Sequence, residues 1–301
     1  MDAAGPDFFV VGAPRAATTS LYHALGQHPQ IFVPPIKEPH FYSCPEVTDT
    51  YYDTVIVDDP DRYRALFEGR GPDQQAGDFS TSYLFRHRSA ARIHADNPEA
   101  RIVMVLRHPV DRALSHHRMD RRDGYTIAPL RELLGPTAPD PRFRREYLDV
   151  GRYAGQVRAY REYFDDRQLH IVLFDDLIAD PATTLRDLLG FLGVDQLDIG
   201  PLEVRNHTGS ARSMLGRRLG TNPVAAQIGR RLGRRGRRLA RRLLYRPNRA
   251  GPDPEDRALL VELLANEIDD LEGVIGRDLS AWKEPQPAPT TTEHGGETAG
   301  I

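Results

Sequence analysis

Short apolar runs alternate with stretches of helical spacing along the first two thirds of the chain. The apolar runs predict buried strands at residues 7–12, 31–33, 75–79, 101–107 and 169–174. The stretches between them predict helices at residues 18–27, 60–69, 86–97, 109–121, 152–164 and 181–192. Because strands alternate with helices, we expect an α/β fold with a parallel sheet covered on both faces. Ligands bind such sheets at the carboxyl ends of the strands.

The remaining segments have other patterns. Residues 254–275 carry apolar side chains at helical spacing and predict one amphipathic helix. Residues 124–148 are rich in glycine and proline and predict either a mobile lid or short helices. Residues 284–301 have the composition of a disordered tail. We therefore expect a single domain over residues 1–283.

Composition narrows the class of protein. With 301 residues and 40% hydrophobic content, the chain can bury a large core. Its one cysteine, Cys44, excludes an intrachain disulfide. Cysteine and histidine do not recur at the spacing of a zinc site, so we expect no metal. No apolar run reaches the roughly 18 residues of a membrane span, and we expect a cytoplasmic protein.

The basic residues are unevenly distributed. The net charge is −3, yet residues 212–249 hold thirteen arginines and no acidic residue. Leucines interleave with the arginine pairs, which fits either a solvated basic helix or a basic helix lying on an anionic membrane surface. A membrane surface is thus a candidate partner and a peripheral location an alternative. We expect no nucleic acid partner, and the sequence leaves the oligomeric state open.

The loop after the first predicted strand has the length of a phosphate-binding P-loop. Gly12 and Thr19 match the two ends of the pattern G-x-x-x-x-G-K-[ST], while Ala17 and Thr18 replace its second glycine and its lysine. A helix start at this point presents backbone N–H groups to an anion, and Arg15 adds a positive charge. The loop therefore predicts an anion site without the lysine of an ATP-using enzyme.

A second candidate anion site follows the clearest strand, at residues 107–115. Arg107 leaves the end of that strand, and Ser115 lies two helical turns further on. Both side chains can reach a phosphate near the start of this helix.

With these two motifs, the chain resembles the sulfotransferases that use 3′-phosphoadenosine-5′-phosphosulfate (PAPS), above all bacterial members and the heparan-sulfate-type sulfotransferase domain. The segment FFVVGAPRAATTSLYHALGQHPQIFVPPIKEPHFYS is similar to the family's first motif, P-[KR]-x-G-T-[ST]-S-L followed by K-E-P-H-F-F. The segment RHPVDRALS resembles the family element R-[DN]-P-x-x-R-x-x-S. The resemblance implies a P-loop-like three-layer fold with a central parallel sheet flanked by helices.

The resemblance also implies which residues hold the donor. The first motif would bind the 5′-phosphosulfate and the second the 3′-phosphate. The expected PAPS-binding residues are Arg15, Ala16, Ala17, Thr18, Thr19, Ser20, Arg107 and Ser115. Apart from the resemblance, Arg212 of the arginine-rich segment is expected to close over the nucleotide.

The expected reaction is in-line transfer of a sulfuryl group to a hydroxyl or amine of a small molecule, glycan or glycolipid. In similar glycan-modifying enzymes the glutamate of K-E-P-H-F is the general base, which implies this role for Glu38. Lys37 would contact the sulfuryl group or the leaving phosphate, and His40 is the second candidate base.

Several alternatives stay open. Phe41, Tyr83 and Phe85 are expected either to line the acceptor site or to pack in the core. At the level of the whole chain, the alternatives are a kinase or NTPase with an altered P-loop, and a non-catalytic protein that binds anions or a membrane surface.

Overall fold

The structure is a computed structural model. It describes residues 5–52, 54–86, 88–136, 138, 140–198 and 253–284, together with two short strands at 210–211 and 245–246. Arg212 lies outside the described residues, so the expectation for it is not addressed. The same holds for the arginine-rich segment apart from 245–246 and for the tail from residue 285.

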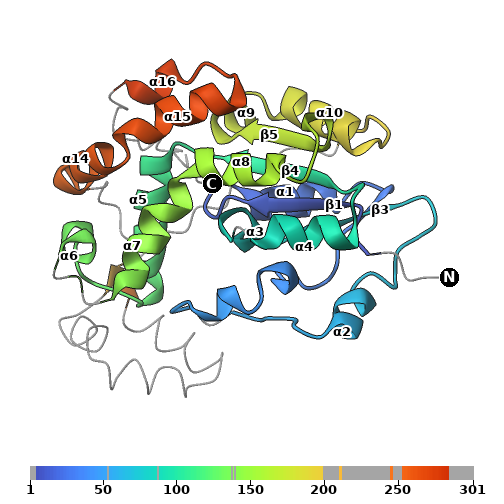
Figure 1. The fold of residues 1–301 in the computed structure, drawn as a ribbon, viewed down its shortest axis with the longest axis horizontal. Helices are drawn as coiled ribbons and strands as arrows, with labels where there is room; N and C mark the ends of the chain where they lie inside the picture. The colour runs from blue at the N-terminus through green and yellow to red at the C-terminus, as the bar shows by residue number, and fades with distance from the viewer. Residues whose placement is uncertain are drawn as a thin grey trace, which may run out of the picture.

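Five parallel strands form the central sheet, in the order β2-β3-β1-β4-β5. Their bounds are Phe8–Gly12 (β1), Ile31–Phe32 (β2), Gln75–Phe79 (β3), Arg101–Leu106 (β4) and Leu169–Leu173 (β5). Helices flank the sheet, and α3, α4 and α8 group together on one side of it (Figure 1). The predicted α/β fold and its parallel sheet are confirmed, and every expected strand is present.

The helices follow the predicted order; most are shorter than predicted, whereas α5 is two residues longer and α10 has the predicted bounds. Those of the central part are α1 (Thr18–Leu25), α2 (Pro60–Ala65), α4 (Arg88–Asp96), α5 (Pro109–Asp123), α8 (Tyr153–Arg161) and α10 (Pro181–Leu192). Two short helices, α3 (Ser82–Phe85) and α9 (Phe174–Ala179), follow β3 and β5 closely. Each is a single turn or little more, which is too short for an apolar period to reveal.

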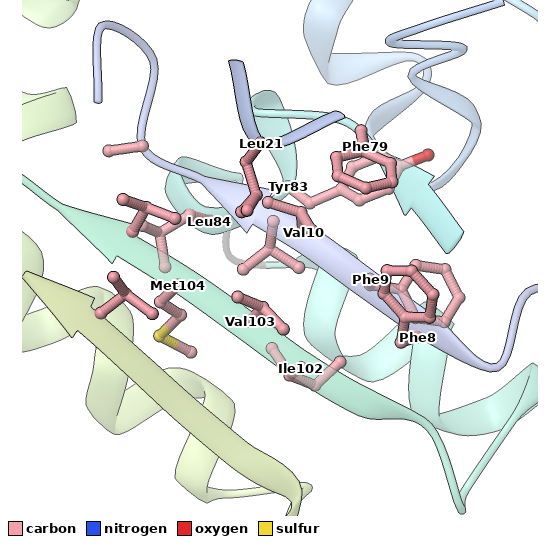
Figure 2. Packing of buried hydrophobic residues seen from close by; sticks show 14 of the residues in the cluster. Phe8, Phe9, Val10, Leu21, Phe79, Tyr83, Leu84, Ile102, Val103 and Met104 are labelled. Carbon is pink, nitrogen blue, oxygen red and sulfur yellow. The ribbon is translucent and has the colours of Figure 1, made fainter. Parts of the chain in front are cut away.

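The centre of the sheet is fully buried. Every residue of β1 is buried, as are the residues of β4 after Arg101, because these strands are covered on both faces. Figure 2 shows Val10, Leu84 and Met104 packed in this core. A Cβ atom on Gly12 would lie 2.7 Å from the Cβ atom of Leu84. The glycine at the end of β1 therefore lets α3 pack directly against the strand.

A second hydrophobic cluster lies beside the sheet, around α5. Residues 124–148 fold there into the short helices α6 (Leu130–Leu134) and α7 (Pro141–Tyr147), whose buried side chains include Leu130 and Tyr147. Of the two expectations for this segment, the structure has the short helices.

The predicted helix over residues 254–275 is wrong in one respect, because it is two helices. It divides into α14 (Pro254–Leu263) and α15 (Ala265–Ile275), with Leu264 at φ −117° and ψ 12° between them. Leu264 packs in the second cluster, whereas Leu271 packs in the core of the sheet. The two halves of this segment therefore pack against different clusters.

The last described helix, α16 (Ser280–Lys283), returns to the sheet, where Trp282 is buried. The strands β6 (Ser210–Ala211) and β7 (Tyr245–Arg246) pair with each other, and β6 lies against α5. Within the described part of the chain, no helix has the length and apolar character needed to span a membrane.

Candidate active site

The predicted site residues lie at one edge of the sheet. In a parallel sheet the carboxyl ends of all strands share an edge, and β1 lies between β3 and β4. The loop after β1 carries Arg15, the loop after β2 carries Glu38, and β4 is followed by Arg107. Strand order thus brings together motifs that are about 90 residues apart in the sequence.

The two anion motifs touch each other. The Nε–H of Arg15 donates a hydrogen bond to Ser115 Oγ at 3.3 Å. Arg107 in turn donates from its guanidinium to the backbone carbonyl of Arg15 at 3.0 Å. The Arg107 guanidinium also lies over the ring of Phe174, with 4.5 Å between Cζ and the ring centroid. Arg15, Ser115 and Arg107 therefore form one continuous group.

This group carries concentrated positive charge. Burial, together with the charges of Arg122, Arg107 and Arg118, lowers the pKa of Arg15 to about 10. Burial also lowers the pKa of Arg107, and Arg118 contributes to this shift. Positive groups that depress each other's pKa in this way favour a bound anion, and a polyanion most of all.

Sequence reasoning missed Arg118 and Arg122. They follow Ser115 at i+3 and i+7, a helical spacing that would have placed them on the same side of α5. Because arginine is common throughout this chain, that spacing alone did not distinguish these two residues.

The nearby carboxylates Asp111 and Asp123 are shared with other arginines. Asp111 forms an ion pair with Arg257 from α14, and Asp123 pairs with Arg122 at 2.9 Å. The side chain of Arg118 has no hydrogen bond or ion pair to any other described residue. The guanidinium groups of Arg15, Arg107 and Arg118 can therefore interact with an anionic ligand.

The backbone of the first motif is shaped for an anion. Ala16 and Thr18 are buried, while Thr19 is exposed and Ser20 is half-buried. No side chain caps the start of α1, and its first turn contains no acidic residue. The first N–H groups of a helix lack partners within the helix, so here they can serve a phosphate or sulfate.

Ala17 holds a backbone conformation that glycine prefers. Its φ of 61° and ψ of 16° are left-handed, and a Cβ atom there costs about 1–2 kcal/mol. We expect Ala17→Gly to raise the free energy of unfolding by roughly 0.5–1 kcal/mol, because relief of this strain exceeds the entropy that glycine adds to the unfolded chain. Urea unfolding of the two proteins measures the difference. Ala24→Gly, in the right-handed part of α1, is the matched control and should lower stability.

Glu38 is half-buried and held by its neighbours. Its Oε1 accepts hydrogen bonds from Lys37 Nζ at 2.8 Å and from Thr81 Oγ1 at 3.0 Å. Burial opposes ionisation, but the charge of Lys37 and these hydrogen bonds lower the pKa of the carboxyl below its ordinary value. Glu38 is therefore a carboxylate at neutral pH. Its Oε2 has no hydrogen bond among the described residues and lies 3.9 Å from His40 Nε2.

Left-handed backbone marks these loops. Among the described residues, the non-glycine positions with positive φ are Arg15, Ala17, Glu38 and His40. All four belong to the predicted site. Such conformations cost free energy and persist where the surrounding structure holds them, typically at functional sites.

His40 is packed on its Nδ1 side. Its ring is buried, with Nδ1 2.7 Å from Ser82 Oγ, and its backbone N–H donates to Ser80 Oγ at 3.2 Å. Burial lowers the pKa of His40, against the opposing effect of Glu38. His40 is thus a neutral ring that supports the loop around Glu38. Phe41, the next residue, is half-buried and stacks on Tyr63 with ring centroids 4.2 Å apart.

Of the two aromatic residues after β3, Tyr83 does not reach the surface. Its ring has no exposed area and lies within the core, as Figure 2 shows, and its hydroxyl donates to Asp78 at 2.8 Å. Tyr83 is therefore a core residue in this structure rather than part of an acceptor pocket. Burial raises the pKa of Asp78 to about 6, although hydrogen bonds from Tyr63, Ser80 and Tyr83 oppose that shift.

Phe85, unlike Tyr83, is partly exposed. Its side chain is half-buried, and the Arg86 guanidinium carbon lies 4.9 Å from its ring centroid. The part of the chain that the structure describes has no cluster of three or more histidine, cysteine or acidic side chains suited to a metal ion.

Comparison with known proteins agrees with this geometry. The sulfotransferase family model matches residues 6–198. Human heparan sulfate glucosamine 3-O-sulfotransferase 6 is 26% identical over 197 residues, covering 64% of this chain and 53% of that protein. Human bifunctional heparan sulfate N-deacetylase/N-sulfotransferase 3 is 29% identical over 200 residues, covering 63% of this chain and 22% of that protein. The chain thus spans about half, or less, of the length of these relatives.

A solved structure extends the similarity to the whole fold. The sulfotransferase from Alicyclobacillus acidocaldarius superposes with a TM-score of 0.71 and 29% sequence identity, covering 93% of this chain and all of that one. The matched region includes both anion motifs and the Glu38 loop. The resemblance seen in the sequence is confirmed, and this chain belongs to the sulfotransferase family.

Proposed function

We propose that this protein transfers a sulfuryl group from PAPS to a hydroxyl or amine, with Glu38 as the general base. One observation carries the proposal: Arg15 donates a hydrogen bond to Ser115, while Arg107 donates a hydrogen bond to the backbone carbonyl of Arg15. The two anion motifs are therefore close enough to bind opposite ends of one nucleotide with a 5′-phosphosulfate and a 3′-phosphate.

Each motif has a separate task. The start of α1 and Arg15 hold the 5′ end and stabilise the charge that develops on the leaving phosphate. Arg107 and Ser115, with Arg118 beside them, hold the 3′-phosphate. The acceptor oxygen or nitrogen forms a bond to sulfur as the bond between sulfur and the 5′-phosphate oxygen breaks, and the acceptor proton passes to Glu38.

The free oxygen of Glu38 supports its role. Oε1 is occupied by Lys37 and Thr81, whereas Oε2 has no hydrogen bond among the described residues and can receive a proton. Lys37 keeps the carboxylate ionised through its ion pair with Glu38. We also assign its ammonium group to the sulfuryl oxygens or the leaving phosphate.

We propose a glycan as one acceptor class, because the relatives above are named for heparan sulfate. A small molecule and a glycolipid are the others. A screen with PAPS labelled in its sulfuryl group identifies the acceptor directly, since only a true acceptor becomes labelled.

Calorimetry tests the donor. We expect the protein to bind 3′-phosphoadenosine-5′-phosphate (PAP), the product form of PAPS, and to bind ATP with magnesium much more weakly, because Thr18 replaces the P-loop lysine. Preference for ATP with magnesium would support a kinase or NTPase and overturn the proposed function.

A further inference from the structure

The residue after Arg107 departs from the similar family pattern. That pattern has aspartate or asparagine before the proline, and this chain has His108. The ring is buried, with 5% of its surface exposed. Its Nδ1 lies 3.2 Å from the backbone nitrogen of Val110 and its Nε2 lies 2.8 Å from the backbone carbonyl oxygen of Trp282. The side chain thus caps α5 and also reaches the far end of the described chain.

These two contacts fix one state of the ring. A backbone N–H only donates, so Nδ1 accepts from Val110 and carries no proton. A carbonyl oxygen only accepts, so Nε2 carries the proton and donates to Trp282. The contacts therefore require the neutral Nε2–H tautomer of His108. Aspartate or asparagine can cap a helix in the same way, but neither is long enough to make the second contact.

The contacts continue from Trp282 back to Arg107. The indole Nε1–H of Trp282 donates to Asp175 at 2.5 Å. Asp175 follows Phe174, whose ring lies under the Arg107 guanidinium. His108 and Arg107 are themselves adjacent in the chain. A closed ring of contacts thus fixes both the backbone and the side chain of Arg107, and α16 completes it.

We propose that His108 and Trp282 are positioning residues for Arg107, so that α16 acts as a latch on the nucleotide-binding loop. The inference rests on the proposed function, since it assigns Arg107 to the 3′-phosphate. Arg107 is the residue that benefits, because a guanidinium must be oriented to make good hydrogen bonds to a phosphate.

A matched control exists within the same chain. His28 has the same pattern: its Nδ1 lies 3.1 Å from the backbone nitrogen of Gln30 and its Nε2 lies 3.0 Å from the backbone carbonyl oxygen of Asp195. It is buried as well. It precedes β2 and so lies at the amino ends of the strands, whereas the site lies at their carboxyl ends. Replacing either histidine with asparagine removes the same remote hydrogen bond, but only one of the two is next to Arg107.

The test measures binding of PAP and of adenosine 5′-monophosphate, which lacks the 3′-phosphate, by calorimetry. We expect His108→Asn to weaken PAP binding about tenfold, the equivalent of one lost hydrogen bond, and to leave binding of the monophosphate unchanged. His28→Asn should change neither affinity. Trp282→Phe, which removes the bond to Asp175, should weaken PAP binding in the same selective way.

Arg107→Gln provides the decisive background. If His108 acts through Arg107, then His108→Asn adds no further loss of PAP affinity once Arg107 is glutamine. An equal loss for both nucleotides, or an additive loss in the Arg107→Gln background, would overturn the latch while leaving the proposed function intact. A wild-type protein that binds PAP no better than the monophosphate would instead overturn the proposed function, and the latch with it.

Acidification gives an independent readout. Burial lowers the pKa of His108 below the ordinary histidine value, with Asp111 and Asp175 opposing this effect and Arg257 adding to it. The neutral ring therefore contributes fully above the ordinary value, and its contribution is lost as the pH falls through the lowered pKa. We expect the PAP affinity of the wild type to approach that of His108→Asn in this acidic range. A constant ratio of the two affinities from pH 8 to acid would contradict the latch; titration of the nucleotide itself cancels in the ratio.

Discussion

Replacing Glu38 with glutamine is expected to lower kcat by about 10²–10⁴-fold, the usual contribution of a positioned general base. Glutamine keeps a carbonyl oxygen that can accept the hydrogen bonds from Lys37 and Thr81. The loop should therefore keep its shape, and the loss reports the missing proton acceptor. Steady-state transfer of labelled sulfuryl groups from PAPS to the acceptor found in the screen measures kcat.

Two measurements separate a lost base from a damaged site. PAP affinity should be little changed in Glu38→Gln, because this side chain belongs to the acceptor side. His40→Gln should cost far less in kcat than Glu38→Gln, since the His40 ring is neutral and its Nδ1 is engaged by Ser82. Full turnover of Glu38→Gln would remove Glu38 from the role of base, and a larger loss in His40→Gln would give that role to the histidine.

Arg107→Gln is expected to weaken PAP binding by about 10–100-fold, because a hydrogen bond to a charged group contributes roughly 1.5–3 kcal/mol and each 1.4 kcal/mol is tenfold. Binding of adenosine 5′-monophosphate should change little, since this arginine serves the 3′-phosphate. Calorimetry with both nucleotides measures the ratio, which is more informative than either affinity alone.

The matched control for Arg107→Gln removes the same charge elsewhere. Arg158 is exposed on α8, and its side chain forms no hydrogen bond or ion pair with another described residue. Arg158→Gln should leave both affinities unchanged. If it weakened PAP binding as strongly as Arg107→Gln, the effect would come from net charge rather than from a specific contact. An equal loss of both nucleotides in Arg107→Gln would place Arg107 outside the 3′-phosphate site.

The strands and their order along the chain could be predicted because each is a compact apolar run ending at glycine or polar residues. The run at β4 is buried on both faces, and its composition alone excludes a surface strand. The motif beginning at Gly12 was visible for a similar reason, since its small and hydroxyl residues follow such a run directly. These signals depend only on residues that are close together in the chain, so they can be recognised in a single sequence.

Other features depend on contacts between distant segments. The aromatic side chain of Tyr83 made it a candidate for the acceptor site. In the structure its hydroxyl donates a hydrogen bond to Asp78 and its ring packs in the core. The helix expected at residues 254–275 breaks at Leu264 because its two halves pack against different clusters. Arg118 stood among many arginines, and only its place beside Arg15 distinguishes it.

The sequence by itself determined the class of this protein: a parallel α/β sheet, a phosphate loop without the ATP lysine, and a second anion motif after the strongest strand. These follow from apolar periodicity and from residue types at fixed spacing. Only the tertiary structure decided that β1 lies beside β4, that Arg15 donates a hydrogen bond to Ser115, and that His108 donates a hydrogen bond to the backbone carbonyl of Trp282. The physical reason is that strand order and the return of the chain end are set by packing over the whole molecule, which no short segment encodes.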